Sequence, residues 1–168
     1  MPPSQHEHVP TDHAGDPPPP NTPGWHCPRC GRTFRRAGQT HVCGTTTVED
    51  HLHGKPAGVV ALFHAFAQMV QAAGPGPVAY APVKGQVGFR GQQRIFAGVK
   101  LTTRGLEGYL DLPRRVESPR FRRISPYTKR LFVHYFVLTD PHQLDAEFSG
   151  WIHEACQVGA GTAVPPTE

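Results

Sequence analysis

Two segments of the chain have apolar residues at every third or fourth position, which is typical of a helix with one buried side. The first stripe consists of Val59, Leu62, Phe63, Phe66 and Val70, and the second of Leu144, Phe148, Trp151, Ile152 and Ala155. The run Gly74-Pro75-Gly76-Pro77 ends the first helix. The run Asp140-Pro141-His142-Gln143 begins the second, because it supplies an acidic cap followed by Pro.

A shorter helix is predicted just before the first stripe. Thr46 and Glu49 have capping-box spacing, which places the start of this helix at Thr46. It should run to about His53, because Gly54 suits a helix end and Pro56 suits the first turn of the next helix.

From Val78 onward the apolar period changes to two, as expected for half-buried strands. The alternating positions are Val87 and Phe89, then Ile95, Ala97, Val99 and Leu101, then Leu106, Gly108, Leu110 and Leu112. Residues 131–138 are apolar on both faces, as in a central strand. The links at 91–93 and 102–105 are long enough only for hairpins. We therefore predict an α+β fold, with an antiparallel sheet of about five strands and helices before and after it.

Composition divides the chain of 168 residues into four parts. Residues 1–24 contain eight Pro and are predicted to be a disordered leader. Residues 25–44 form a zinc knuckle, 46–158 the α+β domain, and 159–168 a disordered tail. Without an apolar run long enough to span a membrane and without a signal peptide, the sequence predicts a cytoplasmic protein with no membrane partner.

The zinc knuckle is predicted from four metal-binding residues within seventeen positions. They are Cys27, Cys30, His41 and Cys43. Three thiolates and one imidazole are a set that structural zinc sites use, and four protein ligands leave no place for an activated water. Cysteines in a reducing compartment also favour a metal over a disulfide. The expected cofactor is therefore structural Zn²⁺.

The single residue between His41 and Cys43 requires a tight turn if both bind one ion, so His26 is an alternative fourth ligand. A redox Cys-x-x-Cys is disfavoured, because no apolar strand precedes Cys27 as in thioredoxin-like proteins. Cys156 lies far along the chain and is expected to be a small core residue.

The net charge of +4 hides a strong asymmetry along the chain. Residues 84–130 hold twelve Lys or Arg and three acids, whereas residues 139–156 hold four acids and no Lys or Arg. A polyanion would meet the basic segment first. Arg122 and Arg123, with Phe121 beside them, make a plausible nucleic-acid contact, and a solvated loop is an equally good interpretation.

Three further residues are candidates for ligand binding. Lys84 and Arg90 flank a predicted strand and could bind an anion or simply be solvated edge charges. His134 lies within an apolar strand, where a hydrogen-bonded packing role is more common than catalysis.

Several short segments together resemble one bacterial family. They are Cys27-Pro28-Arg29-Cys30-Gly31-Arg32-x-Phe34, Gln39-x-His41-x-Cys43, Arg122-Arg123-Ile124-Ser125-Pro126-Tyr127, His134-Tyr135-Phe136 and Leu144-Asp145-x-Glu147 through Trp151-Ile152-x-Glu154-Ala155. The chain looks like the domain of unknown function numbered fifty-six fifty-five, in the form that carries an amino-terminal zinc knuckle, and the likeness extends from Trp25 to about Val158.

The resemblance implies a compact α+β domain without an assigned activity, found elsewhere beside nuclease-like or DNA-associated modules. It assigns the ligand role to the three cysteines and His41 of the knuckle, and it marks Lys84 and His134 as positions of interest. A paired-histidine function is not implied here, because Tyr135 stands where some members have a second His.

Three functions remain open at this point. The leading hypothesis is a non-enzymatic module that contacts nucleic-acid phosphates through the knuckle and the basic segment. An accessory domain would instead dock a protein partner through the leader and the acidic last helix. An enzymatic or small-ligand site would surround His134, Lys84 and Arg90, but no phosphate loop, nucleophile elbow or paired-carboxylate motif accompanies them.

Overall fold

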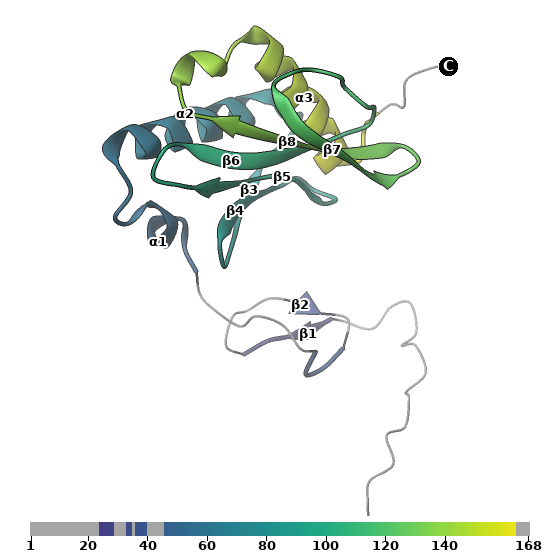
Figure 1. Cartoon of the computed structure of the whole chain (residues 1–168). Helices are drawn as coiled ribbons and strands as arrows, with labels where there is room; N and C mark the ends of the chain where they lie inside the picture. Colours follow the sequence, from purple (N-terminus) through teal and green to yellow (C-terminus); the bar gives the residue numbers. More distant parts are fainter. Residues whose placement is uncertain (1–23, 29–32, 35, 40–45, 164–168) are drawn as a thin grey trace, which may run out of the picture. The chain divides into compact units, whose positions relative to one another are not determined.

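The computed structural model of the chain describes residues 24–28, 33–34, 36–39 and 46–163. The chain divides into two compact units, residues 1–43 and 44–168 (Figure 1). In the first, the strands are β1 (Trp25–His26) and β2 (Thr33–Phe34). The second contains α1 (Val48–Leu52), α2 (Ala57–Ala73), β3 (Ala79–Val83), β4 (Gln86–Arg90), β5 (Ile95–Leu101), β6 (Leu106–Leu112), β7 (Phe121–Thr128), β8 (Leu131–Leu138), the 3₁₀ turn η1 (Pro141–Gln143) and α3 (Ala146–Ala160).

The second unit is built on a six-stranded sheet in the order β3-β4-β5-β6-β8-β7, with every neighbouring pair antiparallel. Four consecutive strands form a meander, and then the chain passes through residues 113–120 before β7 begins. β8 returns between β6 and β7, so β7 becomes an edge strand. The predicted α+β class is confirmed.

The hydrophobic core lies between one face of the sheet and helices α2 and α3 (Figure 1). The ring of Phe66 on α2 lies with its centroid 5.4 Å from that of Phe89 and 5.8 Å from that of Phe136. Phe148 on α3 meets Phe136 edge-on at 5.1 Å. Aromatic contacts of this geometry add to the free energy of burial and fix how the helices sit on the strands. We call this side of the sheet the covered face.

Two helix starts differ from the prediction. The cap of α1 is Thr47 rather than Thr46: its hydroxyl accepts from the backbone N–H of Asp50, whose carboxylate accepts from the backbone N–H of Thr47. Asp140 caps only the turn η1, and α3 begins after a second cap at Asp145. The caps are of the predicted residue types, Thr and Asp. The expected last helix is divided into a turn and a helix because Asp140 caps the one and Asp145 caps the other.

The two edge strands, β3 and β7, were not identified individually from the sequence. Each contains a proline, Pro82 or Pro126, which breaks the alternating pattern and is tolerated where a strand lacks one neighbour. The segment Arg120–Arg123, for which a solvated loop was one interpretation, enters β7 at Phe121. The basic residues Arg122 and Arg123 are therefore held by a sheet.

In the smaller unit, β1 and β2 pair antiparallel, and the rings of Trp25 and Phe34 lie 6.0 Å apart. The predicted leader and tail lie outside the described residues, apart from Gly24 and residues 159–163; of the latter, Gly159 and Ala160 complete α3. Among the helices that the structure describes, none combines the length and the apolar character needed to cross a membrane.

Candidate functional site

The face of the sheet opposite α2 and α3 carries polar and aromatic side chains, and among residues 46–163 no helix packs on its centre. Side chains alternate between the faces along each strand, so cross-strand partners share a face. Lys100 faces Glu107 across β5 and β6, and Tyr109 faces Tyr135 across β6 and β8. We call this surface the open face. Its polar and aromatic residues include Gln86, Arg94, Lys100, Glu107, Tyr109, Asp111, Arg122, Arg123, Ser125, Tyr127 and Tyr135, and the apolar Val133 and Val137 share it.

Tyrosine and arginine side chains are layered at the centre of the open face. The rings of Tyr109 and Tyr135 have centroids 6.4 Å apart, and the guanidinium of Arg123 lies 4.1 Å from the centroid of Tyr135. The ring of Tyr109 covers Gly98, where a Cβ would approach the ring to 2.7 Å. Burial, together with nearby Asp111, raises the pKa of Tyr109 to about 12, so its hydroxyl stays protonated and adds no negative charge.

A β-bulge explains why two consecutive arginines serve the same face. The register between β7 and β8 shifts between Phe121 and Arg123, which leaves Arg122 as the extra residue. Phe121 points to the covered face, where its ring lies 4.6 Å from that of Trp151. Arg122 borders a hollow beside Tyr135, and Arg123 lies over Tyr135 itself. Within the described residues, no carboxylate forms an ion pair with either arginine.

At one end of the open face, Arg94 bridges an acid and a tyrosine. Its guanidinium donates to the Asp111 carboxylate at 2.8 Å and lies 5.2 Å from the ring centroid of Tyr127. Asp111 is 4% exposed, and this burial raises its pKa to about 6 although Arg94 favours the charged form. Tyr127 is 66% exposed, which is unusual for a large ring in a sheet.

The other end of the open face is hollowed. A depression of about 320 Å³ is bordered by Gln86, Lys100, Glu107, Gly108, Tyr109, Arg122, Tyr135, Phe136 and Val137. These residues come from β4, β5, β6, β7 and β8, five of the six strands. The hollow therefore places two tyrosines, a lysine, an arginine and a glutamate within reach of one small group.

His134 lies on the covered face, apart from Arg122 and Arg123. It is fully buried, its Nε2 accepts from the Val116 backbone N–H at 3.0 Å, and its Nδ1 lies 3.1 Å from the Phe132 carbonyl. Burial lowers the pKa of His134, which favours the neutral ring that these two contacts need. This is the hydrogen-bonded packing role expected of a histidine in an apolar strand.

Lys84 and Arg90 are both exposed, but the structure does not bring them together. Lys84 lies in the turn between β3 and β4, whereas Arg90 ends β4 and pairs with Ala79 and Ile95. Neither is among the residues that border the hollow.

Besides Arg94, three further arginines of the basic segment are paired with acids, whereas Arg90, Arg104 and Arg130, like Arg122 and Arg123, form no ion pair within the described residues. Arg114 makes a bidentate ion pair with Glu154 on α3, and Arg115 pairs with Glu117. Arg120 binds Asp145 and Glu147 and donates to the Gln143 carbonyl. Three of the four acids of residues 139–156 are therefore bound by the protein's own arginines.

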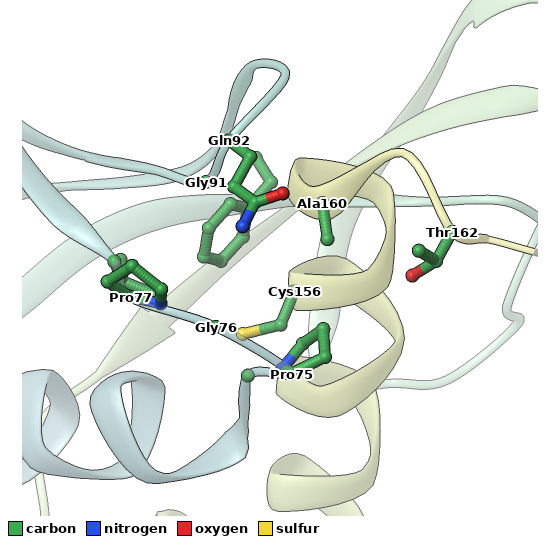
Figure 2. Close-up of a pocket in the computed structure, with 11 residues that line it drawn as sticks. Pro75, Gly76, Pro77, Gly91, Gln92, Cys156, Ala160 and Thr162 are labelled. Atoms are coloured by element: carbon green, nitrogen blue, oxygen red, sulfur yellow. The ribbon is translucent and has the colours of Figure 1, made fainter.

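A second cavity, of about 160 Å³, lies between α3 and the loops that follow α2 and β4 (Figure 2). Figure 2 shows Cys156 projecting from α3 toward the segment of Pro75 and Gly76. Its thiol donates to the Val70 carbonyl with Sγ and O 3.7 Å apart, and burial raises its pKa to about 12. A buried thiol that stays protonated is a poor nucleophile, so Cys156 acts here as a packing residue.

Of the four predicted zinc ligands, only Cys27 lies in the described residues; it is 4% exposed and directly follows β1. Cys30, His41 and Cys43 lie outside them. The alternative ligand His26 is exposed, and its Nδ1 lies 3.0 Å from the Thr33 hydroxyl.

The architecture defines a class of domain: an antiparallel sheet with two long helices on one face and an aromatic, basic surface on the other. The family described as Domain of unknown function (DUF5655) matches residues 48–159, and the chain belongs to this family. The match covers α1 through nearly all of α3. Searches of curated proteins and of solved structures found no match to the chain.

Sequence reasoning found Arg122 and Arg123 but missed Arg94, Lys100 and the three tyrosines of the open face. A signal existed for Lys100 and Tyr109, because both alternate with residues predicted to be buried. Tyr135 had no such signal, since its strand is apolar on both faces. Tyr127 lies on the edge strand β7, which was not predicted because Pro126 interrupts its alternating pattern.

Proposed function

We propose that this domain binds nucleic acid on the open face, without catalysing a reaction on it. The observation that carries the proposal is the Arg123 guanidinium 4.1 Å from the centroid of Tyr135, with Tyr109 beside it on an uncovered sheet surface. Aromatic rings and arginine planes are surfaces on which bases stack, and guanidinium groups bind phosphate oxygens as forks.

The distribution of ion pairs further supports this assignment. Arg114, Arg115 and Arg120 are engaged by acids, whereas Arg122 and Arg123 have no acidic partner among the described residues. Lys100 is exposed on the same face. A phosphate backbone would supply the counter-charge that the protein itself does not give these three groups, with release of bound cations.

The two other functions have less support. Docking of a protein through the acidic last helix competes with Arg114 and Arg120, which already bind Asp145, Glu147 and Glu154. An enzymatic site around His134 would need a ring atom that a substrate can reach, and this ring is 0% exposed.

The test is a salt titration of binding between the full chain and a labelled mixed-sequence oligonucleotide. We expect the logarithm of the affinity to fall linearly with the logarithm of salt concentration. Replacing both arginines (Arg122→Gln and Arg123→Gln) should lower affinity by about tenfold or more and flatten the slope by about one to two.

A matched control removes the same charge from the other side of the unit. Lys55 lies just before α2. Arg115 lies in the loop between β6 and β7, next to Arg114, which pairs with Glu154 on α3. The variant with Lys55→Gln and Arg115→Gln should keep most of the affinity. Equal losses in the two variants would mean that overall charge, and not the open face, binds the nucleic acid.

We also propose that residues 25–44 bind one structural Zn²⁺ through Cys27, Cys30, His41 and Cys43. Support comes from the donor set itself and from Cys27, which is buried beside a hairpin of two-residue strands that is too small to form a core. Metal analysis of the purified chain should give one equivalent of zinc, which Cys27→Ser should remove. Comparing His41→Ala with His26→Ala identifies the fourth ligand, and a zinc-free chain purified under reducing conditions would contradict the proposal.

A further inference from the structure

The size and lining of the hollow on the open face indicate whether the domain binds a single strand or a duplex. Its volume of about 320 Å³ lies at the small end of ligand sites and is far too small for a duplex. Tyr109 and Tyr135 border it, so a flat ring that enters would contact aromatic side chains. Stacking on such rings needs a base whose own face is free, and duplexes keep their base faces hidden.

The polar groups around the hollow differ in sign and position. Lys100 and Arg122 are basic and suit the phosphates on either side of an inserted base. Glu107 is the one acid among the residues that border the hollow, and it is exposed. Among the described residues, no basic group lies within ion-pairing distance of its carboxylate, although Lys100 is its cross-strand neighbour.

A carboxylate is an unfavourable neighbour for phosphate, but it is a strong acceptor for a base that carries N–H donors. Cytosine, adenine and guanine have exocyclic amino groups, whereas uracil and thymine present carbonyl oxygens at the equivalent position. Uracil and thymine keep one ring donor, N3–H, but at the position of cytosine's amino group Glu107 would face a carbonyl oxygen, which offers no hydrogen and repels the carboxylate.

We propose that the hollow receives one unpaired base of a single strand and that Glu107 selects a base with an exocyclic amino group. This inference rests on the proposed function, because it concerns the same face. Tyr109 and Tyr135 supply the stacking surface, Lys100 and Arg122 bind the flanking phosphates, and Glu107 accepts the amino hydrogen.

The test compares two pyrimidine strands, oligo-dC and oligo-dU of about 12 nucleotides, a length within the site sizes of single-strand binders. These bases have the same size and differ where cytosine has its amino group and uracil its carbonyl oxygen. The wild-type chain should bind oligo-dC about five- to tenfold more tightly. A hairpin duplex of equal charge should bind more weakly than either strand.

The variant Glu107→Gln distinguishes recognition from charge. Loss of the negative charge should strengthen binding of both strands, whereas a Gln side chain can both donate and accept, so the preference for oligo-dC should fall to about twofold or less. Glu117→Gln removes the same charge from an exposed side chain that is paired with Arg115, away from the hollow, and should leave the ratio unchanged.

The ratio of affinities decides the outcome. A wild-type chain that binds both strands equally, or a ratio unchanged by Glu107→Gln, would overturn the base-selective hollow while leaving the open face as a general single-strand surface. A chain that binds neither strand at low salt would instead overturn the proposed function.

Discussion

The two faces of the sheet differ most clearly in their buried polar groups. His134 on the covered face is neutral, lies edge-on to the ring of Phe121, and is bonded to backbone groups at both ring nitrogens. Asp111 on the open face is buried beneath a charged arginine and an exposed tyrosine. The covered face satisfies its polar groups internally, whereas the open face keeps charges and rings at its surface. This contrast separates the residues that stabilise the fold from those available to a ligand.

The covered face should be the more sensitive to truncation. Phe66 contacts Phe89, Phe136 and Phe148 and is 0% exposed, so Phe66→Ala should lower the free energy of unfolding by about 3–5 kcal/mol. Urea denaturation followed by circular dichroism measures this change. On the open face, Tyr127→Ala should cost less than about 1 kcal/mol, because the ring is largely exposed. Similar losses for both variants would erase the distinction between the faces.

The pH dependence of stability should identify Asp111. Because its pKa is raised from 3.8 to about 6, the folded state binds a proton that the unfolded state still lacks between about pH 6 and pH 4. As the pH falls through this window, the wild type should gain up to about 3 kcal/mol relative to Asp111→Asn.

Asp145 provides a control of opposite sign. The backbone N–H of Phe148, with Arg120, lowers the pKa of Asp145, so its contribution to stability should be lost as the pH falls through the lowered pKa. Denaturation at a series of pH values, comparing Asp111→Asn and Asp145→Asn each with the wild type, gives both trends. An Asp111 difference that does not vary with pH would mean that Arg94 keeps this carboxylate charged throughout.

Neighbouring residues on β8 allow the sharpest comparison of the two faces. His134→Leu leaves the Val116 N–H without its acceptor and should lower the free energy of unfolding by about 1–3 kcal/mol, with oligonucleotide affinity retained. Tyr135→Leu should change stability less and weaken binding by about tenfold, because one stacking surface is lost. Binding loss in the His134 variant at a temperature where it remains folded would contradict this separation.

The smallest expected effect concerns the position of the Tyr109 ring. A Cβ at residue 98 would approach this ring to 2.7 Å, so Gly98→Ala should displace the ring and weaken binding by a few-fold. The variant Gly150→Ala, at an exposed helix position with open space around it, is the control and should leave binding unchanged. Unchanged binding in the Gly98 variant would mean that Tyr109 is not part of the contact surface.

The covered face was largely predictable from the sequence, because burial leaves a periodic pattern. All five residues of the first helical stripe are buried, as are Phe148, Trp151, Ile152 and Ala155 of the second. A period of 3.6 identifies the buried side of a helix without knowledge of its partner.

The open face could not be assembled from the sequence, because it depends on which strands become neighbours. Tyr109 meets Tyr135 only because β8 inserts between β6 and β7, and no local pattern specifies that order. The bulge that turns Arg122 toward Tyr135 is likewise set by pairing rather than by composition. Exposed residues also tolerate many side chains, so their pattern is weaker than that of a core.

The most direct test of the open face as a binding surface is photo-cross-linking to a single strand that carries 5-iododeoxycytidine, which keeps the amino group of cytosine, followed by mass spectrometry of the adducts. The account predicts adducts on Tyr109, Tyr127 or Tyr135, with loss of the corresponding adduct when each tyrosine is replaced by Leu. Adducts confined to residues 1–45 or to the outer surfaces of α2 and α3 would contradict it, because the nucleic acid would then be bound away from the open face.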